Sequence, residues 1–201
     1  LYAVTYDNFH AFGPGTPDGL VAEGGYNFHS LTEGPDGIYF IGRDELEGWE
    51  QIFRYDPTSQ TISQVTSFTD GSVSNIRDLA ITADGVFFAA DRFDSQTSAW
   101  RNGVLHRLDM DDETVDGDGQ PIGTLSWFGW GGMADDPYVR ELVAVGEQVY
   151  FIAGNDSATD QLWRADDSGA GVVVFDNSSG YDGWFSALAD DYNTYLVAFQ
   201  D

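Results

Sequence analysis

Apolar and β-branched residues in this chain form short runs of about five, separated by clusters of Asp, Ser, Gly and Pro. The clearest example is residues 147–175, where the runs EQVYFIAGN, QLWRAD and GVVVF alternate with turn-forming residues. We find no segment with the 3.6-residue periodicity of an amphipathic helix. The pattern therefore predicts an all-β chain whose antiparallel strands are joined by hairpin turns.

The same four-strand pattern recurs along the chain. First strands are centred on Leu31, Leu79, Leu142 and Leu188, and second strands follow seven or eight residues later, led by Tyr39, Phe87, Tyr150 and Tyr195. The turns between them read PDG, ADG, GEQ and DYN, which suit hairpins. Third strands close on Asp7, Asp56, Asp109 and Asp166, and fourth strands lie within residues 19–23, 61–68, 121–128 and 171–175.

A single four-stranded sheet leaves its faces uncovered, so such units must stack, and radial stacking gives a β-propeller. The N-terminal end carries only a third and a fourth strand and the C-terminal end only a first and a second. We therefore expect one domain, 1–201, with four blades and a ring closed by strands from both ends in one blade. The expected blades are A (185–201 plus 1–28), B (29–75), C (76–138) and D (139–184). The alternative is a portion of a larger propeller, and the strand-like residues at both ends favour a processed product or a piece of a longer protein.

The charge of the chain is strongly negative, with 34 acidic residues against 8 basic ones and a formal net charge of −26. Such a surface is repelled by nucleic-acid phosphates and by anionic lipid headgroups, so we expect neither nucleic-acid binding nor membrane insertion. High salt screens this repulsion, and divalent cations bridge carboxylates. All basic residues are Arg and Asp far exceeds Glu, a composition that favours a salt-loving source over the calcium explanation.

The stretch QLWRADDSGAGVVVF resembles the ELWxxDGT repeat of secreted and surface bacterial proteins, with matches at Leu162, Trp163, Asp166 and Gly171. Gln161 replaces the Glu of that repeat, Asp167-Ser168 replaces Gly-Thr, and the other copies keep little beyond the Arg and the Asp. The resemblance implies a propeller and an extracellular or cell-surface location. It implies no particular activity.

Two sets of residues are candidates for ligand binding. Aromatic, Gly-rich loops precede the first strands, and their residues Trp130 and Trp184 suit stacking on a sugar or an apolar partner. The first strands, which line a propeller channel, begin with His29, with Arg77 and Asp78, and with Arg140 and Glu141. These groups suit a polar ligand. The competing interpretations are that the aromatic loops pack between blades and that the charged groups pair with one another.

Recurrent acidic positions have simpler interpretations. The Asp at the end of each third strand suits a turn, where it accepts backbone N–H bonds, and the Arg two residues earlier suits pairing with a neighbouring strand. The loop DMDDETVDGDGQ offers Asp111, Asp116 and Asp118 as weak calcium ligands. It lacks the bidentate Glu of an EF-hand, and a solvated acidic loop is the alternative.

Signals for catalysis are few. The chain has no Cys, only the three histidines His10, His29 and His106, and neither a G-x-S-x-G nor an H-E-x-x-H motif. We therefore expect an extracellular or cell-surface recognition or structural module that binds a protein or a glycan and needs no cofactor beyond a weakly bound calcium ion. The alternative is a carbohydrate-active enzyme with paired carboxylates at the channel mouth.

Overall fold

The computed structural model describes residues 2–5, 8–11, 20–23, 28–43, 48–68, 71–95, 97–109, 125–127, 137–154, 160–166 and 171–175. Every regular element in these ranges is a strand, and all pairings between strands are antiparallel. This confirms the all-β class that the alternating pattern predicts.

The strands form consecutive meanders, each paired in chain order. The N-terminal sheet contains β1 (Tyr2–Thr5), β2 (Asn8–Ala11) and β3 (Leu20–Glu23). The second contains β4 (His29–Gly34), β5 (Gly37–Arg43), β6 (Glu50–Asp56) and β7 (Thr61–Gln64). The third contains β8 (Val73–Ile81), β9 (Gly85–Asp94), β10 (Ala99–Asp109) and β11 (Leu125–Trp127). The fourth contains β12 (Arg140–Val145), β13 (Gln148–Gly154), β14 (Asp160–Asp166) and β15 (Gly171–Phe175).

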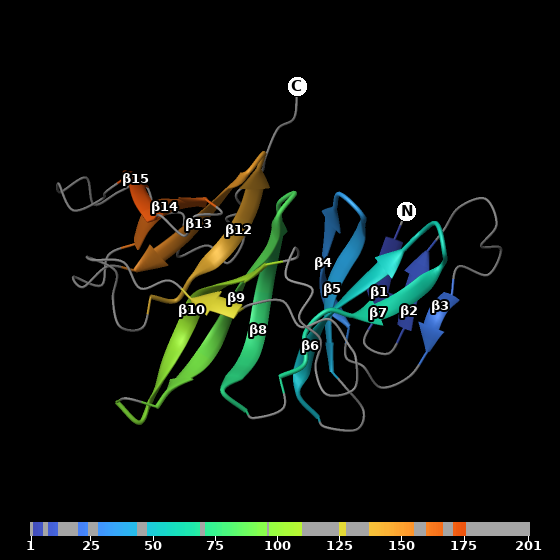
Figure 1. Cartoon of the computed structure of the whole chain (residues 1–201), viewed down its shortest axis with the longest axis horizontal. Coiled ribbons are helices and arrows are strands. Elements are labelled where there is room, and N and C mark those ends of the chain that lie inside the picture. The colour runs from blue at the N-terminus through green and yellow to red at the C-terminus, as the bar shows by residue number, and fades with distance from the viewer. Residues whose placement is uncertain are drawn as a thin grey trace.

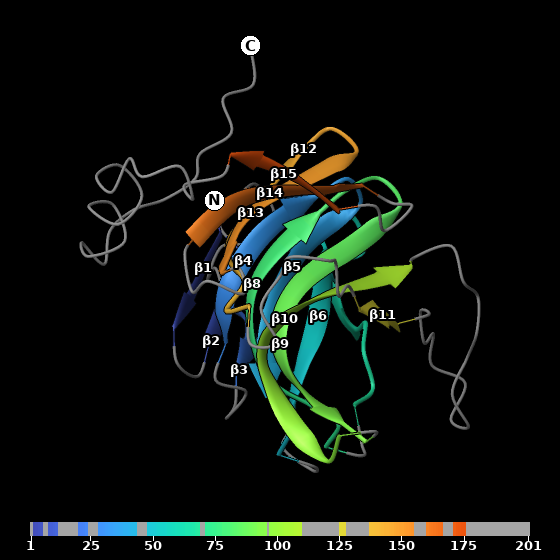
Figure 2. The same ribbon diagram turned by 90° about the vertical axis from the view of Figure 1, so that its left-hand side faces the viewer.

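These sheets stand in a row in chain order, with the N-terminal sheet at one end and the β12–β15 sheet at the other (Figure 1). Their first strands lie next to one another, because β1 contacts β4, β4 contacts β8 and β8 contacts β12. Turned by 90°, the row is seen end-on, and the twisted sheets overlap one behind another (Figure 2). We call β4, β8 and β12 the inner strands.

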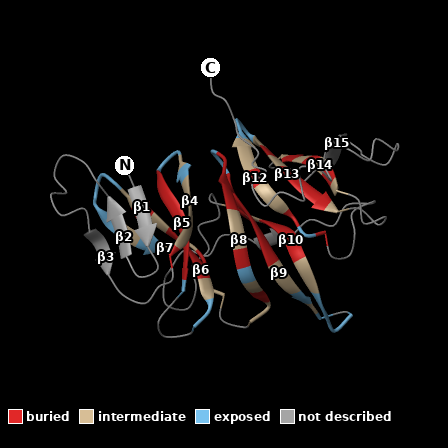
Figure 3. Ribbon diagram, turned by 180° about the vertical axis from the view of Figure 1, so that it is seen from behind, coloured by how far each residue is buried: buried red, intermediate tan, exposed pale blue. Residues whose placement is uncertain are grey.

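Burial follows the two-residue period of the strands. Along β5 and β9, successive side chains point to opposite faces and join different clusters, so both faces of the middle sheets are buried. One cluster joins the second sheet to the third through residues such as Ile41 and Phe88. Another joins the third to the fourth through residues such as Phe87 and Phe151. The hairpin end of β9 and β10 is exposed (Figure 3).

The N-terminal sheet differs from the prediction. We expected residues 1–7 and 19–23 to be consecutive third and fourth strands, but β2 lies between them and pairs with both. The sequence of β2, NFHA, is too short to show an alternation, so the pattern gave no signal for it. The described sheets form no closed ring, and the strands expected in residues 185–201 lie outside the described residues.

Candidate functional site

Each inner strand carries a bulge, which lies near the beginning of β4 and β12 and in the middle of the longer β8. The pairing register shifts between His29 and Thr32 in β4, between Arg77 and Leu79 in β8, and between Arg140 and Val143 in β12. At these bulges the backbone is left-handed, with φ values of 54° at Ser30, 48° at Asp78 and 57° at Glu141. Non-glycine residues rarely adopt this conformation, so its recurrence at equivalent positions marks one built feature of the repeat.

Side chains tie the inner strands to their neighbours at this end of the sheets. Oδ2 of Asp78 accepts a hydrogen bond from the backbone N–H of Glu141 in the next sheet, at 3.1 Å. Oε2 of Glu50 accepts one from the N–H of Ile76, at 2.7 Å. The Thr32 hydroxyl donates to the Leu79 carbonyl, also at 3.1 Å. The candidate site is therefore continuous from β4 to β12.

His29 is the titratable group at the β4 end of this site. Its Nδ1 lies 3.0 Å from Oγ of the neighbouring Ser30. Burial lowers the pKa of His29, while the charges of Glu50 and Asp78 act in the opposite direction. The imidazole is consequently neutral near pH 7, where it both donates and accepts a hydrogen bond.

The two arginines of the site are each held by a carboxylate of their own sheet. Arg77 forms an ion pair with Asp91, which also accepts hydrogen bonds from the N–H of Gly103, at 2.8 Å, and from Nδ2 of Asn75, at 2.9 Å. Arg140 binds Asp160 through both terminal nitrogens, at 3.3 and 2.6 Å. Pairing thus occurs as one interpretation expected, but with partners on other strands.

The sequence analysis did not select these partners. Glu50, Asp91 and Asp160 are scattered among 34 acidic residues, and their role depends on strand register. For Asp91 the strand pattern offers a partial signal. Ala89 pairs directly with Arg77, and Asp91 lies two residues further along β9, on the same face of the strand.

The remaining predicted site residues lie outside the described residues. These are Trp130, Trp184, Asp111, Asp116 and Asp118. One aromatic residue of the predicted loops is described: Phe28, the last residue of the loop 24–28, is 5% exposed and packs edge-on against Phe40 at 5.3 Å between ring centroids. At this position the aromatic ring packs in the core. Within the described ranges, no group of three or more potential metal ligands occurs.

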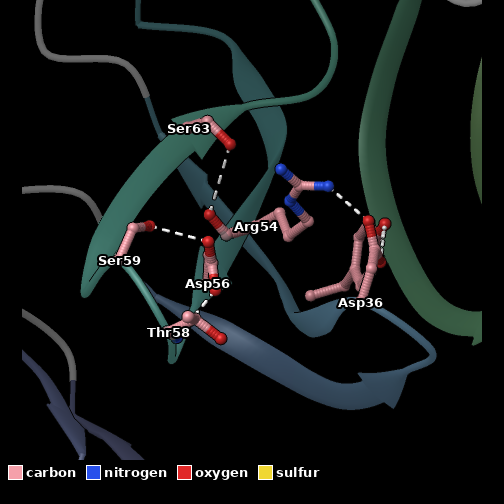
Figure 4. Close-up of polar contacts among 7 residues, drawn as sticks. Asp36, Arg54, Asp56, Thr58, Ser59 and Ser63 are labelled. Carbon is pink, nitrogen blue, oxygen red and sulfur yellow. Dashed lines mark hydrogen bonds and ion pairs between the residues drawn. The ribbon is translucent and has the colours of Figure 1, made fainter.

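The recurrent Asp and Arg positions have structural contacts, which are clearest at the β6 end (Figure 4). Asp56 accepts hydrogen bonds from the Thr58 N–H and the Ser59 hydroxyl, both at 2.7 Å, and these bonds lower the pKa of Asp56. Arg54 forms an ion pair with Asp36 in the β4–β5 turn. The predicted turn role of this Asp is confirmed at Asp56.

Comparison with known proteins adds information about the fold. No protein-family model and no curated protein matches this chain. Among solved structures, a puromycin hydrolase S511A mutant complexed with PGG matches with a TM-score of 0.53 and 15% identity, over 84% of this chain and 23% of that one. It has a propeller-type fold. The match supports a propeller-type arrangement of the described sheets in this chain.

Two further structures match with lower scores. The tricorn protease gives a TM-score of 0.35 at 14% identity, over 84% of this chain and 20% of that one. TolB from Acinetobacter baumannii gives 0.32 at 10% identity, over 85% and 50%. This chain thus spans half or less of each of these proteins. The propeller-type fold that the resemblance to ELWxxDGT-repeat proteins implies is supported. Membership of this chain in that repeat family is not supported by any family match.

The part of the chain that the structure describes contains no helical segment with the length and hydrophobicity of a membrane span.

Proposed function

We propose that this chain is an extracellular or cell-surface recognition module that binds a protein partner or a glycan at the bulges of its inner strands. The observation that carries this proposal is the recurrence of these bulges in three neighbouring sheets. Asp78 contacts the backbone of Glu141 in the next sheet and acts electrostatically on His29 in the preceding one, and Asp78 and Glu141 each follow directly after an arginine held by a carboxylate.

The chemistry of this face suits hydroxyl-rich or amide-rich ligands. A neutral imidazole donates and accepts hydrogen bonds, and an arginine held by a carboxylate still presents other N–H donors. Ordered polar groups on rigid strands lose little conformational entropy when a ligand binds. We include in the proposal the aromatic side chains Trp130 and Trp184, which precede the inner-strand positions in the repeat and supply the flat surface on which sugar rings stack.

The architecture proposed with this function is a ring in which strands from the two ends of the chain share one blade. The alternative is that the four described sheets belong to a larger propeller. The match to only 23% of the puromycin hydrolase chain is compatible with that alternative.

A glycan array probed with the full chain in molar KCl tests the function. We expect a defined set of glycans to bind, and Trp130→Ala and His29→Ala to reduce the signal by at least about tenfold with an unchanged melting temperature. Gln64→Ala, at the opposite edge of the second sheet, is the matched control and should bind normally. A variant that binds normally, or that loses binding only by unfolding, contradicts the assignment of that residue.

Binding of a protein partner, the second ligand class, is tested by affinity capture from an extracellular fraction. The same two variants must lose that partner while Gln64→Ala retains it. If neither glycan nor protein binding depends on this face, the proposal is wrong.

A further inference from the structure

The hairpin of β9 and β10 is longer than the equivalent hairpins of the sheets beside it. β9 and β10 contain 10 and 11 residues, whereas β5, β6, β13 and β14 contain 7 residues each. The additional residues lie at the hairpin end, which extends beyond the β12–β15 sheet (Figure 3). We call the paired residues 92–94 and 99–101 the extended ribbon. Because the second and fourth sheets form without such an extension, the repeat itself does not require it.

The two faces of the extended ribbon differ in chemistry. Phe93 pairs directly with Trp100, so both rings lie on one face, 5.7 Å apart between centroids and edge to face. The residues that follow them, Asp94 and Arg101, point to the opposite face. There, Nε and Nη2 of Arg101 donate hydrogen bonds to Oδ2 of Asp94, at 3.1 and 3.0 Å. The ribbon therefore has an aromatic face and a charged face.

The aromatic face is open to solvent. Phe93 is 38% exposed and Trp100 is 47% exposed. Ala89 lies on the same face of β9, four residues earlier, and is buried in the cluster that the third sheet shares with the fourth. A further exposed aromatic residue adjoins the ribbon, because the N–H of Tyr138 donates to the carbonyl of Asn102 at 3.3 Å. The aromatic face thus begins where the cover by the fourth sheet ends.

This face continues directly into the candidate site. Asp91 lies two residues before Phe93 on the same face of β9. Its carboxylate forms the ion pair with Arg77 and accepts the N–H of Gly103. A flat apolar surface beside ordered hydrogen-bonding groups is the combination that a sugar needs, because a sugar ring has apolar C–H faces and a polar rim of hydroxyls.

Charge around the ribbon favours a neutral ligand. Arg77, Arg101 and Arg140 each form an ion pair with a carboxylate, so these arginines add no excess positive charge. The net charge of −26 repels sulfated or uronate-containing polymers. A cationic ligand would have to compete with arginine for Asp91 and Asp94, the carboxylates that flank Phe93.

The area of the aromatic face favours a small contact. A Phe or Trp side chain presents about 150–250 Å² when fully exposed, so the exposed fractions of Phe93 and Trp100 leave on the order of 100–200 Å² in total. A stable protein–protein interface buries about 800 Å² on each partner. The aromatic face is far smaller than that and suits one or two sugar rings.

We propose that Phe93 and Trp100 form the stacking platform of the recognition site and that the ligand of this site is a neutral glycan. The inference rests on the proposed function and narrows it from a protein or a glycan to one chemical class. It also adds two residues that the sequence analysis did not select.

A glycan array that carries neutral oligosaccharides and their sulfated or uronate-containing counterparts tests this inference, with the full chain in molar KCl. Trp100→Leu keeps an apolar side chain but loses the flat ring, and it should reduce binding of neutral glycans by at least about tenfold. Trp100→Tyr keeps a ring and should retain most of the binding. Phe93→Leu should act like Trp100→Leu at a smaller size, and it replaces that variant if Trp100→Leu does not fold.

Val145→Ala is the matched control. Val145 is 49% exposed, like Trp100, but lies at the far end of β12, so its substitution should leave binding unchanged. The melting temperature of each variant is measured alongside, so that loss of binding is distinguished from loss of folding.

Several results would overturn the inference. Normal binding by folded Trp100→Leu would remove the platform but leave the recognition role, which His29→Ala tests separately. Equal losses in Trp100→Leu and Trp100→Tyr would assign the effect to packing, and a preference for sulfated or uronate glycans would contradict the ligand class. A wild-type dimer that Trp100→Leu dissociates in ultracentrifugation would make the ribbon an interface between copies. Binding of a protein but no glycan would also overturn it, and binding of neither would reject the proposed function as well.

Discussion

The buried residue His106 makes the stability of the fold depend on pH. Its ring is fully buried in β10 and stacks on Phe88 with centroids 5.1 Å apart. Burial, with a smaller contribution from the charge of Arg92, lowers the pKa of His106 from its ordinary value of 6.5 to about 3. The folded protein therefore keeps this imidazole neutral at pH values where the unfolded chain protonates it.

This difference predicts the acid dependence of stability. Between pH 6.5 and pH 3 the unfolded state binds the extra proton, so the free energy of unfolding falls as the pH falls, by up to about 1.4 kcal/mol per pH unit from this group. His106→Phe should remove that contribution. Urea unfolding at pH 7 and pH 5 measures it, with His29→Gln, at a half-buried site, as the control expected to change the slope less. Equal slopes for wild type and His106→Phe would contradict the account.

The left-handed backbone conformation of three site residues could not be predicted from the sequence. A glycine would have signalled a positive φ, but the chain places Ser30, Asp78 and Glu141 there instead. Polarity alone selected Asp78 and Glu141 as candidates. Their positions on bulges, and the contact of Asp78 with the next sheet, follow from strand register and packing.

At the scale of the element, the hairpins were the most predictable feature. Turn residues and apolar alternation located the strands from β4 to β15, because both signals are local. The lengths of β8, β9 and β10 were not predicted. The extension around residues 99–102 reads AWRN, without alternation, and is stabilised by contacts across the hairpin, such as Phe93 with Trp100 at 5.7 Å between ring centroids and Arg101 with Asp94.

Two hairpin glycines should respond differently to substitution. A Cβ at Gly37 would collide with the carbonyl oxygen of Tyr55, so Gly37→Ala should destabilise the domain by about 1–3 kcal/mol. Gly146 has open space around it and φ of 62°, so Gly146→Ala should cost only about 1 kcal/mol, from backbone strain. Chemical denaturation gives both values. A larger loss of stability for Gly146→Ala than for Gly37→Ala would mean that the β4–β5 hairpin does not pack against Tyr55 as described.

The link between β8 and β12 can be tested as an element. Asp78→Ala leaves the N–H of Glu141 without its acceptor, which should cost about 1–3 kcal/mol, whereas Asp78→Asn keeps an acceptor oxygen and should cost less. Urea midpoints of the two variants measure the difference. Identical midpoints for Asp78→Ala and wild type would contradict the role of this carboxylate.

At the scale of the whole molecule, charge dominates. Ion pairs with carboxylates hold several arginines in the described residues, among them Arg43, Arg54, Arg77, Arg101, Arg107 and Arg140. With 34 acidic residues in total, most carboxylates have no cationic partner available. The folded state therefore concentrates negative charge, and the repulsion between these charges destabilises it when little salt is present to screen them.

Added salt should stabilise the fold. We expect the melting temperature to rise by tens of degrees between dilute buffer and molar KCl, because the screening length falls to about 3 Å at 1 M. A comparable rise with millimolar CaCl₂ at low KCl would assign the stabilisation to divalent cations instead. A melting temperature that changes with neither KCl nor CaCl₂ would show that charge repulsion does not limit the stability of the fold.

The central claim is that neighbouring inner strands lie side by side, so that their bulged ends form one face. The contact between Asp78 and Glu141, 63 residues apart, reports this directly. In NMR spectra of the labelled protein, the amide proton of Glu141 should show nuclear Overhauser cross-peaks to the β-protons of Asp78, because the Glu141 nitrogen lies 3.1 Å from Oδ2 of Asp78. A Glu141 amide with sequential cross-peaks but none to Asp78 would show that the two strands are not neighbours, and the proposed site would not exist.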